Sequence, residues 1–309
     1  MLVLLALGAC DMGDLTEPEG GPPRVAPTQI AEARSWVRTV VTDGSSLYWA
    51  NYDVSTGRSA RAVVDRTGAA GGERQELVVE PHPPEQLDVD GGFLYWSYEL
   101  GPLKRVALAG GEPEVLLEHT GAKCFDADGP DVFLMRDGDV VHVDPATREN
   151  RVIARKALGD CVVALGDALF WTERKQIATV PRVGGEPTPL VELNKPDGLV
   201  VFDGALYTCV DDVLTRVDPS TGETKPIRSY CHSDGLAVSE NGHWFRREYF
   251  EGWPPQEHQR IAEVTSEGVS WLFDGLGVSS VAIADGHVIW FGRAEGSGGD
   301  WKGYRAPLP

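Results

Sequence analysis

A short motif that recurs along the chain constrains the fold more than any other feature. Its clearest copy covers residues 90–96, where an Asp-Gly-Gly turn precedes the apolar run Phe-Leu-Tyr-Trp. The copies lie at residues 43–49, 90–96, 128–134, 166–171, 203–208, 241–246 and 285–290. Their last residues are roughly 37 to 47 positions apart, which is the period of four-stranded repeats that are arranged in a ring. Each copy is therefore expected to mark one repeat.

Period-two alternation of apolar residues divides each repeat into four strands. In the second repeat the expected strands are 86–89, 93–97, 103–108 and 114–117. Glycine and proline between the last two strands are typical of hairpin turns rather than of phosphate loops. The sequence therefore predicts an all-β, seven-bladed β-propeller.

The two ends of the repeat region complement each other. The last repeat stops one strand short, whereas residues 27–32 precede the first motif just as residues 187–192 precede the motif at 203–208. We therefore expect an N-terminal outer strand to complete the last blade and close the ring, which removes exposed strand edges. The expected domain is 27–309.

The first ten residues form a short apolar run that ends in Leu7, Gly8, Ala9 and Cys10. This run resembles a bacterial lipoprotein signal with its lipobox, and the resemblance implies acylation of Cys10. The run is too short to span a bilayer. Residues 11–26 are rich in glycine, proline and acid, the composition of a flexible tether. The predicted location is the bacterial cell envelope, either periplasmic or on the surface, with the membrane contacted through the lipid anchor only.

The remaining four cysteines form an even set, as expected of an exported protein with disulfides. Three pairings are open. Cys124 and Cys161 occupy equivalent positions in adjacent repeats, and Cys209 and Cys231 fall on the same face, so proximity favours these two pairs. A metal site that uses Cys231, His232 and a carboxylate is the alternative.

Three aspartates fall at the start of the inner strand in three consecutive repeats: Asp160, Asp197 and Asp234. Inner strands begin at the top of a propeller channel, so these carboxylates could converge on Ca²⁺, which accepts oxygen ligands in flexible geometry, or on a polar ligand. Alternatively, each aspartate caps its own turn.

The longest loops belong to repeats six, seven and one, which are neighbours in a closed ring, and loops on a rigid scaffold are where binding usually resides. The loop of repeat six carries Tyr249, Phe250 and Trp253. These aromatic residues suit a partner surface on the top face, or they pack against their own blade.

The Leu-Tyr and Phe-Trp pairs of the motif, as in Leu94–Tyr95–Trp96 and Phe170–Trp171, resemble the YWTD, NHL and TolB-like propeller repeats of extracytoplasmic proteins. The resemblance covers residues 27–309 and implies fold rather than function. Four tryptophans share one position in the motif, and we expect them to pack between blades: Trp49, Trp96, Trp171 and Trp290.

The net charge and the motifs of the sequence argue against several classes of function. A net charge of −19 opposes binding to nucleic acid or to anionic headgroups. The sequence has no Gly-x-Ser-x-Gly elbow, His-Glu-x-x-His helix or Walker loop. We therefore expect a monomeric binding or scaffold module rather than an enzyme, whose top face takes an envelope protein or a polar ligand. The alternative is a metal-dependent hydrolase or lactonase at the channel mouth.

Overall fold

The computed structural model describes residues 27–308 except for thirteen short gaps. The gaps are 34, 36, 54–60, 99–100, 121–123, 160, 212, 230–236, 239–243, 250–257, 266–267, 277 and 294–300. For much of 228–280 it describes the backbone alone. The predicted signal and tether, with Cys10, lie outside the described residues.

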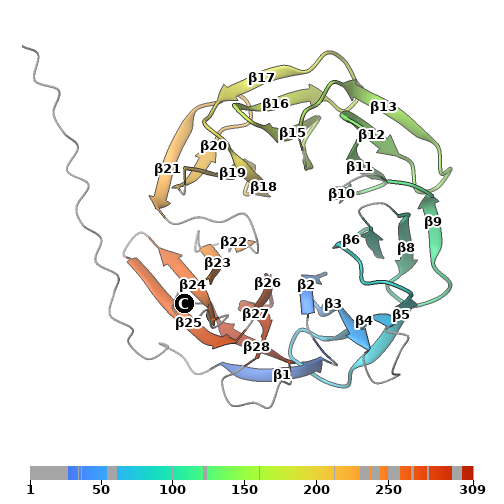
Figure 1. Ribbon diagram of the computed structural model, residues 1–309, viewed down its shortest axis with the longest axis vertical. Helices are drawn as coiled ribbons and strands as arrows, with labels where there is room; N and C mark the ends of the chain where they lie inside the picture. Colours follow the sequence, from blue (N-terminus) through green and yellow to red (C-terminus); the bar gives the residue numbers. More distant parts are fainter. Residues whose placement is uncertain are drawn as a thin grey trace, which may run out of the picture.

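The described residues form 28 strands in four-stranded antiparallel sheets that surround a central channel (Figure 1). From the channel outward, the first four sheets are β2 (Val37–Thr42), β3 (Ser46–Asp53), β4 (Arg61–Gly68), β5 (Gln75–Glu80); β6 (Gln86–Asp90), β7 (Phe93–Ser97), β8 (Leu103–Ala107), β9 (Glu114–Leu117); β10 (Phe125–Asp128), β11 (Asp131–Arg136), β12 (Asp139–Val143), β13 (Asn150–Arg155); and β14 (Val162–Leu165), β15 (Ala168–Glu173), β16 (Gln176–Pro181), β17 (Thr188–Glu192). The others are β18 (Asp197–Phe202), β19 (Ala205–Val210), β20 (Val213–Val217), β21 (Thr224–Ser229); β22 (Ala237–Val238), β23 (Trp244–Tyr249), β24 (His258–Thr265), β25 (Gly268–Leu276); and β26 (Val278–Ala284), β27 (His287–Gly292), β28 (Trp301–Pro307), β1 (Thr28–Ala33).

The Asp-Gly element of the motif is the tight turn between the first two strands of a sheet. Oδ1 of Asp43 accepts hydrogen bonds from the backbone N–H groups of Ser45 and Ser46, at 2.9 and 2.7 Å. Gly44 has φ +87°, in the left-handed region that glycine enters without a steric penalty. The turn chemistry that the sequence indicates thus sets the boundary between inner and second strands, and the strands predicted for the second repeat are confirmed to within one residue.

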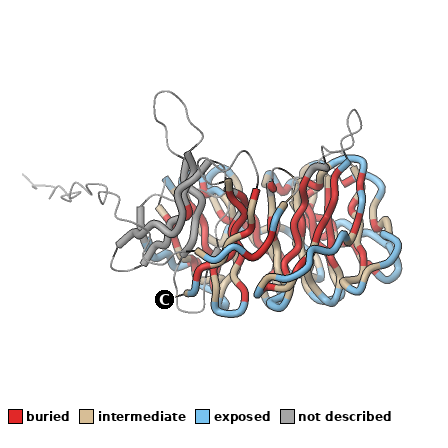
Figure 2. Tube along the Cα trace, turned by 90° about the horizontal axis from the view of Figure 1, so that it is seen from below, coloured by how far each residue is buried: buried red, intermediate tan, exposed pale blue. Residues whose placement is uncertain are grey.

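The core lies between neighbouring sheets, because each core cluster joins residues of adjacent sheets. Figure 2 shows the buried residues along the middle of the strands and many of the exposed ones at the turns. All four motif tryptophans are fully buried. Trp49 on β3 packs against Phe291 on β27 of the neighbouring sheet, with ring centroids 4.8 Å apart. The predicted role of these tryptophans in packing between blades is therefore confirmed.

The N-terminal strand closes the ring as expected. β1 pairs with β28 in antiparallel register, from Thr28 opposite Arg305 to Ala33 opposite Trp301, so the two ends of the propeller meet in one sheet (Figure 1). Ile30 and Ala31 are buried in the core cluster that β1 shares with β27 and β28. Backbone pairing and apolar burial both hold the closure.

The expectation of a seven-bladed propeller needs correction. Six sheets are regular blades, but the sheet β22–β25 departs from the blade pattern. Among the described residues its inner strand comprises two residues, which pair with β23, Ala237 with Phe245 and Val238 with Trp244. In the sequence, Asp234–Gly235 precede this strand and Ser239–Glu240–Asn241–Gly242 follow it, and residues of these types disfavour strands. The chain therefore forms six regular blades and one sheet with a vestigial inner strand.

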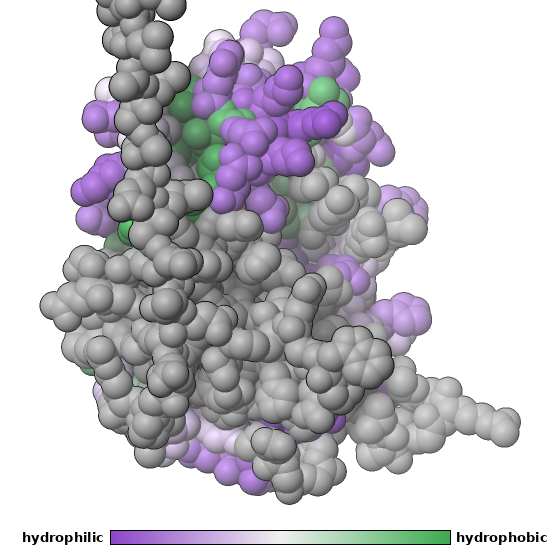
Figure 3. Space-filling model, turned by 60° about the vertical axis from the view of Figure 1, so that its left-hand side comes forward, coloured by the Kyte–Doolittle hydropathy of each residue, from purple (hydrophilic) through white to green (hydrophobic). Residues whose placement is uncertain are grey.

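The described surface is mostly polar. Where Figure 3 draws the surface in colour, it is mainly hydrophilic, with apolar side chains between the polar ones. Two large apolar side chains in the described part stand out for their exposure, Leu158 at 78% and Val183 at 82%. No helix among the described residues is long and apolar enough to cross a membrane.

Candidate functional site at the channel mouth

The structure contains a cavity of about 1200 Å³ at one end of the central channel. We call this end the mouth: it is where inner strands β6, β10, β14 and β18 begin and where the hairpins β15–β16 and β19–β20 turn. Apolar inner-strand residues such as Leu87, Val163 and Val201 line the wall between a few polar groups. Concave sites that combine apolar walls with a few polar groups are where proteins usually bind ligands.

Two carboxylates line the cavity side by side, Asp88 on β6 and Asp126 on β10. Each accepts a hydrogen bond from the backbone of the next inner strand along the ring. Oδ2 of Asp88 accepts from the N–H of Ala127 at 2.9 Å, and Oδ2 of Asp126 accepts from the N–H of Ala164 at 2.8 Å. Oδ1 of Asp88 also accepts from the N–H of Val89 at 2.8 Å. The two aspartates thus connect three consecutive blades.

Burial in the channel wall raises the pKa of both carboxyl groups, to about 6 for Asp88 and about 7 for Asp126. Desolvation is the largest cause in each case, because it disfavours the charged form. The hydrogen bonds from backbone N–H groups lower each pKa, and the negative charges of neighbouring aspartates raise it. Near neutral pH the pair therefore holds less than two full negative charges.

A second pair of aspartates lies one step deeper along the same strands. Oδ2 of Asp90 accepts a hydrogen bond from the N–H of Gly129 at 2.6 Å. Asp128 forms an ion pair with Arg182, whose guanidinium lies over the ring of Phe133 at 5.3 Å from its centroid. The charge of Arg182 also lowers the pKa of Asp126. The deeper carboxylates thus have dedicated partners in the neighbouring blades.

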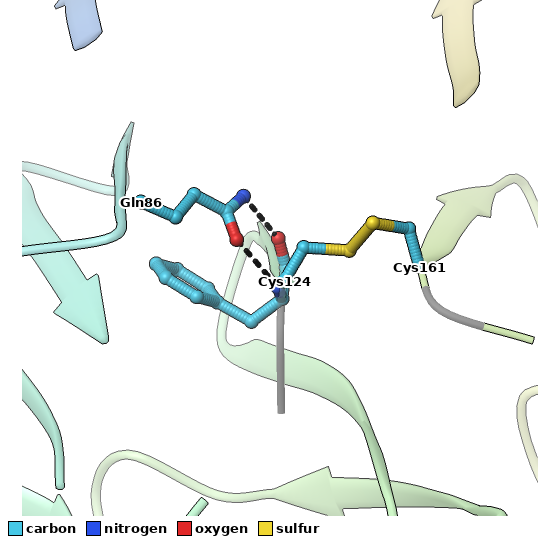
Figure 4. The surroundings of a disulfide bond; sticks show 4 residues. Gln86, Cys124 and Cys161 are labelled. Atoms are coloured by element: carbon cyan, nitrogen blue, oxygen red, sulfur yellow. Dashed lines mark hydrogen bonds between the residues drawn. A yellow bond between two sulfur atoms is a disulfide. The ribbon is translucent and has the colours of Figure 1, made fainter. Parts of the chain in front are cut away.

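A disulfide between Cys124 and Cys161 lies in the cavity wall and joins the third and fourth blades (Figure 4). Their Cα atoms are 5.3 Å apart. On the other side of Cys124, Gln86 of the second blade binds the backbone of Phe125 through both ends of its side-chain amide (Figure 4). The predicted pair Cys124–Cys161 is confirmed. At the mouth, two hydrogen bonds thus join the second blade to the third, and a disulfide joins the third to the fourth.

The rim of the cavity carries charges of both signs. Glu173 is held by the indole N–H of Trp171 and by the amide of Gln176, both at 2.8 Å. Arg174 and Lys195 are exposed and line the same opening. Leu158 adds an exposed apolar side chain there. The rim is therefore amphipathic, whereas the fixed charges on the inner wall are acidic.

The structure describes only one of the three aspartates of the predicted site. Asp197 begins β18, is exposed and lines the cavity, as expected of a residue at the top of an inner strand. Asp160 and Asp234 lie outside the described residues, so convergence of the three carboxylates stays a prediction. In the part of the chain that the structure describes, no group of three or more His, Cys, Asp or Glu side chains is placed to hold a metal ion.

The other predicted residues fall mainly where side chains are not described. Cys209 is disulfide-bonded and lines the cavity, but its expected partner, Cys231, lies outside the described residues. Tyr249 ends β23 as backbone only, and Phe250 and Trp253 lie outside the described residues. The aromatic partner surface and the long loops that carry it stay predictions.

Sequence reasoning overlooked Asp88 and Asp126. Each pairs with the aromatic residue next to the last position of the motif, Asp88 with Tyr95 and Asp126 with Phe133. The blades on either side place valine there, Val41 opposite Tyr48 and Val163 opposite Phe170. The sequence does carry a signal for these two aspartates. Polar residues recur at every second position of 86–90 and 124–128, whereas the corresponding inner strands of the other repeats are mainly apolar.

Comparisons with known proteins agree with this architecture. No protein-family model matches the chain, and no curated protein is significantly similar to it. Among solved structures, an oligogalacturonate lyase from Vibrio parahaemolyticus matches with TM-score 0.64 and 12% identity over 91% of each chain. The chain is a β-propeller. The WD40 β-propeller domain of Doa1 matches with TM-score 0.60 and 13% identity, over 90% of this chain and 96% of that one.

A chain in the structure of a mitotic checkpoint complex matches with TM-score 0.62 and 13% identity, over 99% of this chain and 100% of that one. At such identities the likeness shows the fold alone. Propellers of this kind occur in protein complexes as well as in enzymes, so the activity of this chain has to be argued from its own site.

Proposed function

We propose that this chain is a lipid-anchored propeller of the bacterial cell envelope that acts as a binding module and takes its ligand or partner at the mouth of the central channel. The observation that carries the proposal is the cavity, which combines apolar walls with Asp88 and Asp126. Concave sites of this kind with a few convergent polar groups are the usual place of ligand binding.

The construction of the cavity wall supports binding rather than simple packing. A site binds well when its shape exists before the ligand arrives, because less ordering is then required. Here the disulfide Cys124–Cys161 and the amide of Gln86 fix the start of three inner strands. The mouth is thus preorganised.

The lipobox with Cys10 and the acidic tether support the envelope location, and the disulfides agree with an oxidising compartment. A tether between lipid and propeller would leave the mouth free to face a partner. The metal-dependent hydrolase has no specific observation in its favour among the described residues, and we do not advance it.

The proposal is tested by filling the cavity. Val163 lines it, so Val163→Trp should occupy the space, whereas Val183→Trp places the same side chain on an exposed turn away from the cavity. Melting temperatures of wild type and both variants are measured with fractions of an envelope extract and a small-molecule library, since specific binding to the folded state raises stability.

We expect ligands that stabilise wild type and Val183→Trp but not Val163→Trp. Ligands that stabilise all three proteins equally would place binding elsewhere on the molecule.

A further inference from the structure

One atom at the mouth stands out. Oδ2 of Asp126 accepts the hydrogen bond from Ala164, but Oδ1 of Asp126 accepts none from the described residues. The side chain is partly buried and lines the cavity. An ionised carboxylate can accept several hydrogen bonds, so Asp126 has acceptor capacity left for a ligand donor in the cavity.

The charges around Asp126 indicate which donor it would accept. Asp88 lies beside it in the wall, while Arg182, whose charge lowers the pKa of Asp126, is already paired with Asp128. An anionic group would meet two carboxylates there, whereas a cation would offset their repulsion and supply N–H donors. Charge-assisted hydrogen bonds of this kind are roughly twice as strong as neutral ones.

The rest of the wall indicates what carries the cation. Leu87, Val162 and Leu199 line the same cavity as the two carboxylates, and Leu158, which also lines it, is exposed. Such a surface suits an unbranched hydrocarbon stem, as the stem of lysine packs on apolar surface while its ammonium group finds polar partners.

Resting on the proposed function above, we propose that the cavity binds a primary ammonium group on an unbranched alkyl stem, with the ammonium at Asp126 and Asp88. A free alkylamine and the lysine side chain of a peptide share this chemistry. The positive charge of the ammonium group favours the ionised form of both carboxylates, so protons are released as the ligand binds near neutral pH.

The test uses three six-carbon probes that differ only in the head group: hexylamine, hexanol and hexanoate. Each is titrated into the full propeller by calorimetry at pH 7. We expect hexylamine to bind at least tenfold more tightly than the other two. Its observed enthalpy should differ between phosphate and Tris buffers, because these buffers take up the released protons with different enthalpies.

Asp126→Asn and Asp90→Asn form a matched pair of variants. An amide oxygen can still accept the backbone hydrogen bond in both, so both should fold, which circular dichroism and melting verify. Asp90 is on the same inner strand as Asp88 and makes the same kind of contact, but it does not line the cavity. Asp126→Asn should lose at least tenfold in hexylamine affinity together with the buffer dependence, and Asp90→Asn should keep both.

A pentapeptide with a central lysine and its acetyl-lysine counterpart distinguish the source of the ammonium group. Binding of the lysine peptide but not of hexylamine assigns the site to a protein partner. Equal binding of hexylamine and hexanol would overturn the inference while leaving the cavity as a binding site. If neither hexylamine nor the lysine peptide binds, the inference is also overturned. The proposed function is then tested separately by the comparison of Val163→Trp with wild type.

Discussion

Gln86 holds the backbone of Phe125 in the neighbouring blade at both of its polar groups. Oε1 of Gln86 accepts a hydrogen bond from the N–H of Phe125 at 2.7 Å, and Nε2 donates one to its carbonyl oxygen at 2.7 Å. Phe125 follows directly on Cys124, whose disulfide reaches Cys161. The side-chain amide of Gln86 and the disulfide therefore follow one another along the mouth and together connect the starts of three inner strands.

The first prediction concerns this seam. Removing the disulfide with Cys124→Ala and Cys161→Ala should lower the free energy of unfolding by about 2 to 4 kcal/mol, because the crosslink closes a loop of 37 residues. Gln86→Ala should cost about 1 to 3 kcal/mol, since it leaves two backbone groups of Phe125 without partners. Urea unfolding of the three proteins measures both effects.

A reducing agent serves as the control for the seam. With Cys209 protected or replaced, the reducing agent should destabilise wild type about as much as the two cysteine substitutions do. It should leave the stability of the cysteine variant unchanged. A cysteine variant as stable as wild type would show that the three inner strands are held without the crosslink.

The second prediction concerns closure of the ring. Deleting residues 1–33 removes β1, exposes the edge of β28 and uncovers the surface on which Ile30 and Ala31 are buried. Aggregation or a large fall in melting temperature should follow. Deleting residues 1–24 leaves β1 intact and should be tolerated. Scanning calorimetry and size-exclusion chromatography compare the two, and equal behaviour would contradict the closure by β1.

Repetition explains why the ring was accessible from the sequence. The strands of residues 86–117 and the pairing of 27–32 with the last sheet follow from turn signals and strand periodicity, which recur in every blade. The motif did not predict one irregular sheet. Its copy at residues 241–246 predicts a regular blade, but polar residues flank Ala237–Val238, and the inner strand described there has two residues.

The candidate site was less accessible, because it depends on contacts between blades that a single repeat does not encode. Arg182 and Asp128 are 54 positions apart in the sequence, and their ion pair follows only from the ring. Cys124–Cys161 could be predicted, since equivalent positions in adjacent blades must be neighbours. Asp88 and Asp126 obey the same rule, but they lie within their inner strands rather than at the first position, where the sequence predicted the aspartate site.

The third prediction concerns pH. Asp88 and Asp126 have folded-state pKa values of about 6 and 7, above the ordinary 3.8. Well below pH 4 both groups are protonated in the folded and the unfolded chain. As pH rises from about 4 toward the folded-state pKa values, the unfolded chain releases these protons while the folded protein keeps them, so the two groups make the fold progressively less stable, and the loss is complete above about pH 7.

Asp88→Asn with Asp126→Asn should remove this dependence. The wild type should lose on the order of 1 kcal/mol per carboxylate between pH 5 and pH 8, a reduced figure because the cavity admits water. This corresponds to about 2 to 4 °C in melting temperature for each carboxylate. The double variant should melt at more nearly the same temperature at both values of pH. A pH dependence identical to that of wild type would mean that other groups titrate in this range.

The fourth prediction concerns the anchor. Acylation requires the thiol of Cys10, so Cys10→Ser, expressed behind a complete export signal, should abolish partition into the detergent phase of Triton X-114. Wild type behind the same signal is the control. Partition of the serine variant with the detergent would contradict the lipoprotein hypothesis.

Hydrogen–deuterium exchange with and without a stabilising ligand tests the central claim, that the channel mouth is the binding site, most directly. The account predicts that protection gained on binding is concentrated at the mouth ends of β6, β10 and β14, around Gln86, Phe125 and Val162, while the outer strands β9, β13 and β17 exchange as before. Protection gained on the outer strands, with none at the mouth, would contradict it.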